Sequence, residues 1–193
     1  MLAVSAMPAR SQGAPVGERF VSRKYAFSLA VPQGRFYTRT AGSGLLTELF
    51  SFNPQKELES KGRLVVGHLP EPVKGGAFID IYAREWRPET ATLSAWADKD
   101  WRDGPDRSPS APSPTIQVLE MPPESGISGA IMTVYDVIPD ASNAPAQRCA
   151  SVCWEFKQRS FAAHLYYLRS DGKGPKFEQN LLEVVRSIRP LQK

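Results

Sequence analysis

Apolar and polar residues alternate in several short stretches of this chain, and each stretch predicts a β-strand. In residues 25–31 every second side chain is large and apolar, and Pro32-Gln33-Gly34 ends the run. Stretches rich in β-branched and aromatic residues predict further strands at 45–52, 63–69, 77–82, 116–119 and 130–138. The first four of these strands are interpreted as an antiparallel meander.

A helical repeat replaces this alternation after residue 90. Thr90 or Thr92 can serve as the N-cap of a helix. The apolar positions of this helix follow the i, i+3, i+4, i+8 spacing and should face the core; they are Leu93, Trp96, Ala97 and Trp101. The pattern therefore predicts a helix that buries two tryptophans.

A second helix is predicted over residues 175–188, with Pro175 in its first turn. Its apolar stripe should pack on the sheet and consists of Phe177, Leu181, Val184, Val185 and Ile188. Arg186 and Arg189 follow in the last turn, where the helix dipole favours cations.

A β-hairpin is predicted over residues 148–169, with a two-residue turn at Gln158-Arg159. In this register Cys153 lies directly across from His164 on one face. The large apolar side chains lie on the other face, under the second helix; they are Trp154, Phe156, Phe161 and Leu165. A shift of the turn by one residue would remove the Cys153–His164 pair.

Composition favours one globular domain. The chain has 193 residues, 41% of them hydrophobic, which is enough for one core. No apolar run approaches the roughly 18–20 residues that span a bilayer, so no integral membrane segment is expected. The net charge is only +4, and basic residues alternate with acidic ones, which argues against a nucleic-acid binder.

The N-terminal residues 1–19 are interpreted as a flexible tail or the remnant of a signal peptide. They contain small and apolar residues and no acid before Glu18, but they lack the basic start of a secretory signal. If the true start lies upstream, the protein is exported to the periplasm or secreted; otherwise it is cytoplasmic. The domain itself is expected over 20–190, with an exposed Pro-rich loop at 105–114.

The order of these elements resembles the PsbP-like family. The order begins with the strand Tyr25-Ala-Phe-Ser-Leu-Ala-Val-Pro. The middle helix follows and starts with Thr92-Leu-Ser-Ala-Trp-Ala, and the order ends with a hairpin and a helix. The most specific piece is Val184-Val-Arg-Ser-Ile-Arg, where such proteins carry a Ser-Phe-Arg-like ending. The resemblance implies an α+β fold, an antiparallel sheet flanked by helices in an α/β/α sandwich. The Pro-rich segment departs from the family pattern.

Few residues are suited to catalysis. The chain lacks a nucleophile elbow, a phosphate-binding loop and a metalloprotease motif, and it has only two histidines, His68 and His164. Cys149 and Cys153 lie about 13 Å apart if they share one strand, beyond the roughly 7 Å limit for a disulfide, so both are expected to be free thiols. Their spacing also does not fit a zinc knuckle. No cofactor and no metal site is expected.

Two functions therefore remain open. The resemblance implies a non-enzymatic binding or assembly domain that acts through protein–protein contacts, because family members include an extrinsic protein of photosynthetic water oxidation and a Ran-binding import factor. The alternative is a small thiol-dependent enzyme or redox protein, in which His164 lowers the pKa of the Cys153 thiol. No sequence motif supplies an orienting acid or oxyanion donors for that chemistry.

Overall fold

The structure is a computed structural model that describes residues 19–31, 37–39, 45–50, 74–84, 92–102, 113–137 and 145–192. Its helices are α2 (Leu93–Arg102), the short 3-10 helix η1 (Pro123–Ser125) and α3 (Gly174–Arg186). Its strands are β1 (Arg19–Ser22), β2 (Phe27–Ala30), β3 (Tyr37–Arg39), β4 (Leu45–Phe50), β5 (Ala77–Arg84), β6 (Thr115–Leu119), β7 (Ile127–Val137), β8 (Gln147–Phe156), β9 (Arg159–Leu168) and β10 (Arg189–Pro190).

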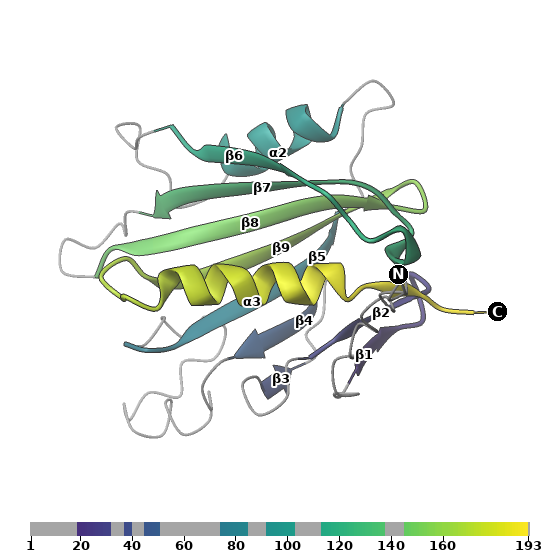
Figure 1. The fold of residues 1–193 in the computed structure, drawn as a ribbon, viewed down its shortest axis with the longest axis horizontal. Coiled ribbons are helices and arrows are strands. Elements are labelled where there is room, and N and C mark those ends of the chain that lie inside the picture. Colours follow the sequence, from purple (N-terminus) through teal and green to yellow (C-terminus); the bar gives the residue numbers. More distant parts are fainter. Residues whose placement is uncertain are drawn as a thin grey trace, which may run out of the picture.

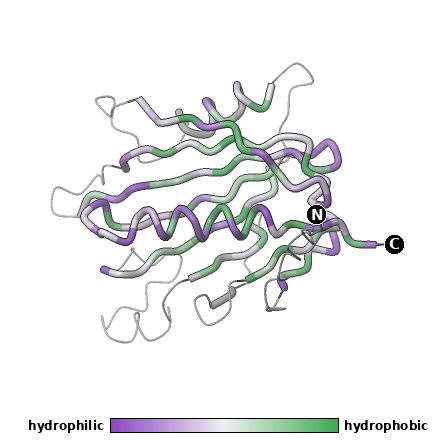
Figure 2. Tube along the Cα trace, viewed as in Figure 1, coloured by the Kyte–Doolittle hydropathy of each residue, from purple (hydrophilic) through white to green (hydrophobic). Residues whose placement is uncertain are grey.

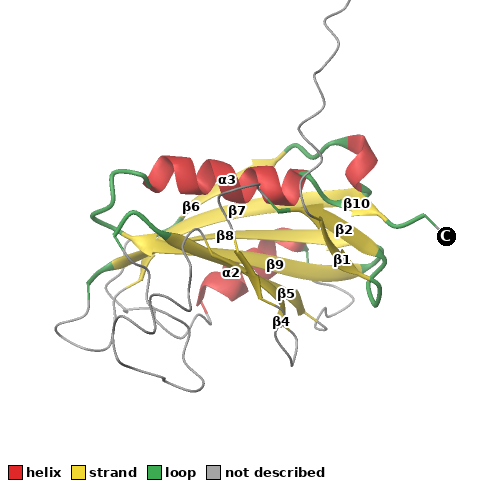
Figure 3. Ribbon diagram, turned by 90° about the horizontal axis from the view of Figure 1, so that it is seen from below, coloured by secondary structure: helices red, strands yellow, loops and turns green. Residues whose placement is uncertain are grey.

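One antiparallel sheet forms the centre of the fold. Its seven strands are ordered β3-β4-β5-β9-β8-β7-β6, and a second sheet has the order β1-β2-β10. Helix α3 lies along one face of the large sheet and α2 lies against the other (Figures 1 and 3). The prediction of an α+β fold with an antiparallel sheet flanked by helices is confirmed. No helix in the described ranges is long and apolar enough to cross a membrane.

The main core lies between the large sheet and α3. Polar and apolar residues alternate along α3, which turns its apolar stripe to the sheet (Figure 2). Every residue of the predicted stripe is buried, from Phe177 to Ile188. On the sheet, Trp154 stacks on Phe161 at 5.6 Å between ring centroids. The predicted packing of the hairpin under the C-terminal helix is therefore confirmed.

The N-terminal strand prediction was partly wrong. Residues 25–31 do not form one strand of the meander: Tyr25 and Ala26 lie in the turn between β1 and β2, and Ala26 has a φ of 55°. Strand β2 pairs with β1 on one side and with β10 on the other. The reason is tertiary, because β10 lies about 160 residues further along the chain and local alternation carries no information about such a partner.

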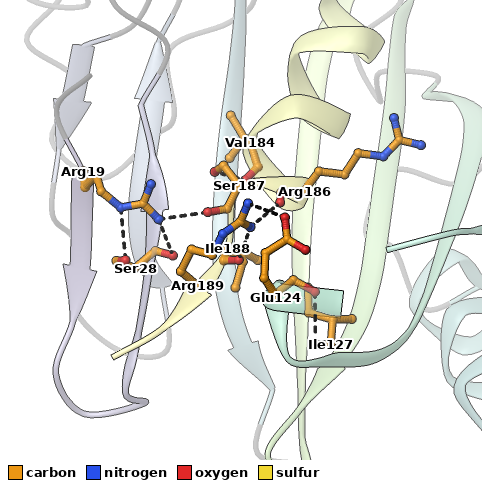
Figure 4. Close-up of polar contacts among 10 residues, drawn as sticks. Arg19, Ser28, Glu124, Ile127, Val184, Arg186, Ser187, Ile188 and Arg189 are labelled. Atoms are coloured by element: carbon orange, nitrogen blue, oxygen red, sulfur yellow. Dashed lines mark hydrogen bonds and ion pairs between the residues drawn. The ribbon is translucent and has the colours of Figure 1, made fainter. Parts of the chain in front are cut away.

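Two arginines hold the C-terminal end of α3 in place (Figure 4). The Arg19 guanidinium donates to the Ser187 carbonyl at 2.9 Å, and Arg189 donates to the carbonyls of Arg186 and Ile188 at 2.8 and 2.7 Å. The Arg186 carbonyl lies in the last turn of α3, where the helix dipole is negative, and Ser187 is the C-cap that follows it. Arg186 lies in the last turn as predicted, whereas Arg189 lies beyond the helix in β10 and reaches back to its end. Arg19 joins β1 to the same helix end.

The register of the hairpin differs from the prediction. The turn residues are Lys157 and Gln158, with φ values of 48° and 60°, so Phe156 pairs with Arg159. Positive φ at both central residues is the geometry of a type I′ turn, whose twist matches the flanking strands. The whole register moves by two residues. Because side chains alternate with a period of two, every predicted residue stays on its predicted face.

Several predictions fall outside the described residues. These are the tail at 1–18, the strand at 63–69, the residues 105–112 of the Pro-rich loop, and His68. The backbone of α2 is described, but the side chains of Trp96 and Trp101 are not. At the start of α2, the Thr92 hydroxyl accepts the Ala95 N–H at 3.2 Å, which confirms Thr92 as an N-cap.

Two glycines lie at the start of α3: Gly172 in the preceding turn and Gly174 as the first residue of the helix. The packing requires a glycine only at position 174. A Cβ atom at Gly174 would lie 2.7 Å from Cε2 of Tyr167, whereas one at Gly172 would meet nothing within 4 Å. Gly174→Ala should therefore lower the free energy of unfolding by about 1–3 kcal/mol, and Gly172→Ala should change it by less than about 0.5 kcal/mol. Urea denaturation of both variants tests this, and equal effects would contradict it.

Candidate functional site

A row of polar side chains crosses the sheet on the face that carries α2. The strand register aligns Asp80 of β5 with His164 of β9, His164 with Ser151 of β8, and Ser151 with Thr133 of β7. All four are buried, and Asp80 is fully inaccessible to solvent. Directly opposite residues in antiparallel strands have Cβ atoms about 4.5–5.5 Å apart, so the row is continuous.

Aromatic rings and a thiol surround this row. The His164 ring lies 5.6 Å from the ring of Tyr82 and 6.2 Å from that of Tyr166, measured between centroids. The Tyr82 hydroxyl donates to Oδ2 of Asp80 at 3.4 Å. On the other side of His164, Ser151 Oγ lies 3.7 Å from the Cys153 sulfur. The row is thus a line of buried polar side chains bordered by apolar groups.

The predicted pairing of Cys153 with His164 was wrong. Cys153 lies across from Ala162, and His164 lies across from Ser151. The two-residue shift of the register makes Cys153 and His164 diagonal neighbours on one face rather than direct partners. Cys153 instead packs with Ala97 of α2, Ile131 and Ala162 in a small apolar cluster. An apolar environment disfavours the thiolate that nucleophilic chemistry needs.

Both cysteines are free, as the strand spacing predicted, and both are fully buried. Within the described ranges no three His, Cys, Asp or Glu side chains are grouped closely enough to hold a metal ion. The thiols therefore sit inside the fold as small apolar side chains.

Asp80 is the residue that sequence reasoning missed. It brings the residue types of a serine triad, Asp80, His164 and Ser151, into one line across three strands. A signal was present in the sequence, since Asp80 is the one charged residue in the apolar run 77–82. The alignment itself depends on β5 pairing with β9, which are about 80 residues apart. Burial of all three side chains is typical of a closed polar network rather than an open catalytic site.

A second feature lies where two turns meet at one end of the sheet. Arg23 and Lys24 belong to the β1–β2 turn, Lys157 belongs to the β8–β9 turn, and Arg159 is the first residue of β9 beside that turn; all four are exposed. We call these four residues the basic end. The buried ring of Tyr25 joins the turns, since Lys24 Nζ lies 5.1 Å and Arg159 Cζ lies 5.5 Å from its centroid.

The backbone of the basic end is unusual as well. Every non-glycine residue with positive φ in the described part of the chain lies in these two turns: Ala26, Lys157 and Gln158. Type I′ turns favour Asn and Gly, so Lys157 and Gln158 occupy this turn at a local energetic cost. Within the described ranges, none of the four cations forms an ion pair with a carboxylate. The basic end thus gathers positive charge with which no carboxylate of the described ranges forms an ion pair.

The comparisons with known proteins identify a fold but no family. No family model and no curated protein matches this chain. Among solved structures, a point mutant of the protein Mog1 aligns with a TM-score of 0.53 and 10% identity over 91% of this chain and 96% of its own. The Ran-binding protein Mog1p of Saccharomyces cerevisiae aligns with a TM-score of 0.51 and 10% identity over 91% and 95%. At such identity the likeness shows the fold alone.

Proposed function

We propose that this chain is a non-enzymatic binding or assembly domain of the PsbP-like kind, which docks an acidic segment of a partner protein on the basic end. The observation that carries the proposal is the meeting of four exposed cations from two turns without an ion-paired carboxylate in the described ranges. Carboxylates supply the complementary charge. Yeast Mog1p, which shares this fold, is a Ran-binding protein, and this gives coarse support for a protein partner.

The surroundings of the four cations favour a protein partner over other polyanions. Single-stranded nucleic acid stacks its bases on exposed aromatic rings, but the aromatic rings here, Tyr25 and Phe156, are buried beneath the cations. Insertion into a membrane surface requires exposed apolar side chains, and the residues 23–26 and 157–158 of these turns present none of that kind. Binding of an acidic peptide requires only that the protein hold positive charges at fixed positions.

Contact with aromatic rings also prepares the cations for binding. Lys24 and Arg159 lie over one ring, and Lys157 Nζ lies 5.3 Å from the Phe156 centroid. Such contacts restrict the long side chains before a ligand arrives, which reduces the entropy lost on binding. They also hold like charges near each other, and a bound carboxylate would relieve their repulsion.

The test uses a fluorescein-labelled octaglutamate peptide and fluorescence anisotropy at low salt. The double variant Lys157→Glu/Arg159→Glu should raise the Kd of the peptide by about tenfold or more, because two exposed pairs are lost and two repulsions are added. Lys173→Glu/Lys176→Glu makes the same change of net charge at the start of α3, at the other end of the sheet (Figure 1), and should change the Kd by less than about twofold.

Three outcomes would overturn the proposal. One is the absence of peptide binding by the unmodified chain, and another is an equal loss of affinity in both double variants, which would indicate attraction by net charge alone. The third is binding to phosphatidylserine vesicles or to a single-stranded oligonucleotide, sensitive to Lys157 and Arg159, without binding to the peptide. Circular dichroism and thermal melting show whether each variant is folded.

The alternative function is a small enzyme centred on Cys153 and the polar row. The alignment of Asp80, His164 and Ser151 is the observation that favours it. Because both thiols are fully buried, we expect iodoacetamide to label Cys149 and Cys153 only after denaturation. Mass spectrometry of the native chain across pH 6–9 measures this. Rapid native labelling of Cys153 with an apparent pKa near 6 would instead favour the thiol enzyme.

A further inference from the structure

A further feature is the edge of the seven-stranded sheet at β6, which lies two strands away from β8 in the strand order. Strand β6 is the last strand of the seven-stranded sheet and, among the described strands, pairs only with β7. Four of its five residues are exposed. Ile116 is 53% exposed and Val118 is 77% exposed, which are the two highest values among the exposed large hydrophobic residues of the described ranges. An exposed apolar edge strand marks an interaction site.

The edge at β6 lacks the features that proteins use to block strand addition. Its sequence, Thr115-Ile-Gln-Val-Leu119, contains no charge, no proline and no glycine, and its five pairs with β7 continue without a bulge. The opposite edge of the same sheet is β3, which has only three residues and ends in Arg39. Of the two edge strands that the structure describes, β6 is the longer and carries no charge.

Helix α2 leaves this edge open. Ile116 and Val118 lie on the α2 face, across from Thr133 and Ile131 of β7. Ile131 is buried in the cluster with Ala97 of α2, but Val118 beside it is exposed. The apolar surface under α2 thus continues past the helix to the outermost strand, where no described residue covers it.

The geometry of β6 points to a second copy of this chain as the occupant. We infer that two copies pair their β6 strands antiparallel about a two-fold axis through Gln117. In that register Gln117 meets its own copy, and Ile116 of each copy lies across from Val118 of the other on the same face. Both pairs are β-branched and apolar. The strand is complementary to itself, which a two-fold interface requires.

The charged residues near β6 do not oppose this pairing, although each copy carries a net positive charge. Between Ser113 and Pro123 the only charged residue is Glu120, and in the two-fold register it lies beyond the end of the strand, across from Pro114. No like charges face each other along the shared edge. Five paired residues bury less surface than the roughly 1,200 Å² of a stable interface, so the dimer is weak and depends on concentration. This pairing does not involve the basic end and stands apart from the proposed function.

Sedimentation velocity over a concentration series tests the pairing with the full chain. Val118→Lys places a cation on the edge and should weaken the dimer by about tenfold or more. Val21→Lys makes the same change at the exposed Val21 of β1 and should leave the dimer unchanged. Because Val118 and Val21 are both exposed, both variants should fold like the unmodified chain, which circular dichroism checks.

A crosslinking experiment tests the register. Gln117→Cys should form a disulfide between two copies under mild oxidation, because residue 117 meets itself at the axis. The exposed Gln158→Cys in the β8–β9 turn serves as the control, and the native thiols are buried. The inference is overturned if the chain stays monomeric at several hundred micromolar, if Val118→Lys and Val21→Lys act alike, or if Gln117→Cys crosslinks no better than Gln158→Cys. A monomer that instead captures an extended segment of another protein on β6 also overturns it.

Discussion

Replacing Trp154 with alanine should lower the free energy of unfolding by about 3–5 kcal/mol. The Trp154 side chain is fully buried in the main core, where it stacks on Phe161. The substitution removes the largest fully buried side chain of the described core and leaves a cavity that the rigid sheet cannot close. Urea denaturation followed by circular dichroism measures the loss. A change below about 1 kcal/mol would contradict the packing described above.

Trp154→Phe provides the matched control. The indole Nε1 of Trp154 is buried and has no hydrogen-bond partner within the described ranges, so phenylalanine removes a polar atom that contributes no bond. It also keeps an aromatic ring against Phe161. We expect a loss of less than about 2 kcal/mol, since a smaller cavity remains. Equal losses for Trp154→Ala and Trp154→Phe would show that ring packing is not what the core requires at this position.

Leu181→Ala should destabilise the protein by about 2–5 kcal/mol, because Leu181 is fully buried on the stripe that α3 turns to the sheet. Leu182 is its neighbour in the same helix and is only partly buried. Leu182→Ala makes the same chemical change, with the same effect on helix propensity, and should cost about 1 kcal/mol. Thermal and urea denaturation of both variants compare them, and a larger loss for Leu182→Ala would contradict the orientation of α3.

The elements that could be predicted from the sequence are those whose signal is local. The stripe of α3 repeats with the helical period over about three turns, and β5 is apolar from Ala77 to Tyr82 except at Asp80. The cap at Thr92 also depends only on residues within one turn of it. In each case one face is strongly apolar, and the physical requirement to bury that face leaves few alternatives.

Local alternation predicts the faces of the hairpin strands but not the position of the turn. Alternation assigned Trp154 and Cys153 to opposite faces correctly, because a register change of two residues preserves parity. It could not distinguish a turn at Gln158-Arg159 from the observed turn at Lys157-Gln158. The difference lies in ring contacts such as Trp154 on Phe161 and in the pairing of β9 with β5, which are tertiary.

Both candidate sites also arise from contacts between distant segments. Asp80 and Ser151 reach His164 only because β5 and β8 flank β9, and the basic end exists because the β1–β2 and β8–β9 turns share the ring of Tyr25. The sequence by itself determined the faces of the strands and the buried stripe of α3, because hydrophobic periodicity shows which side chains must be buried. The α+β class was implied by the resemblance to the PsbP-like family, and the sheet order of the structure confirms it. Only the tertiary structure decided the register, the second sheet and the neighbours of each polar side chain, because strand partners far apart in the chain are selected by packing and leave no periodic trace in the sequence.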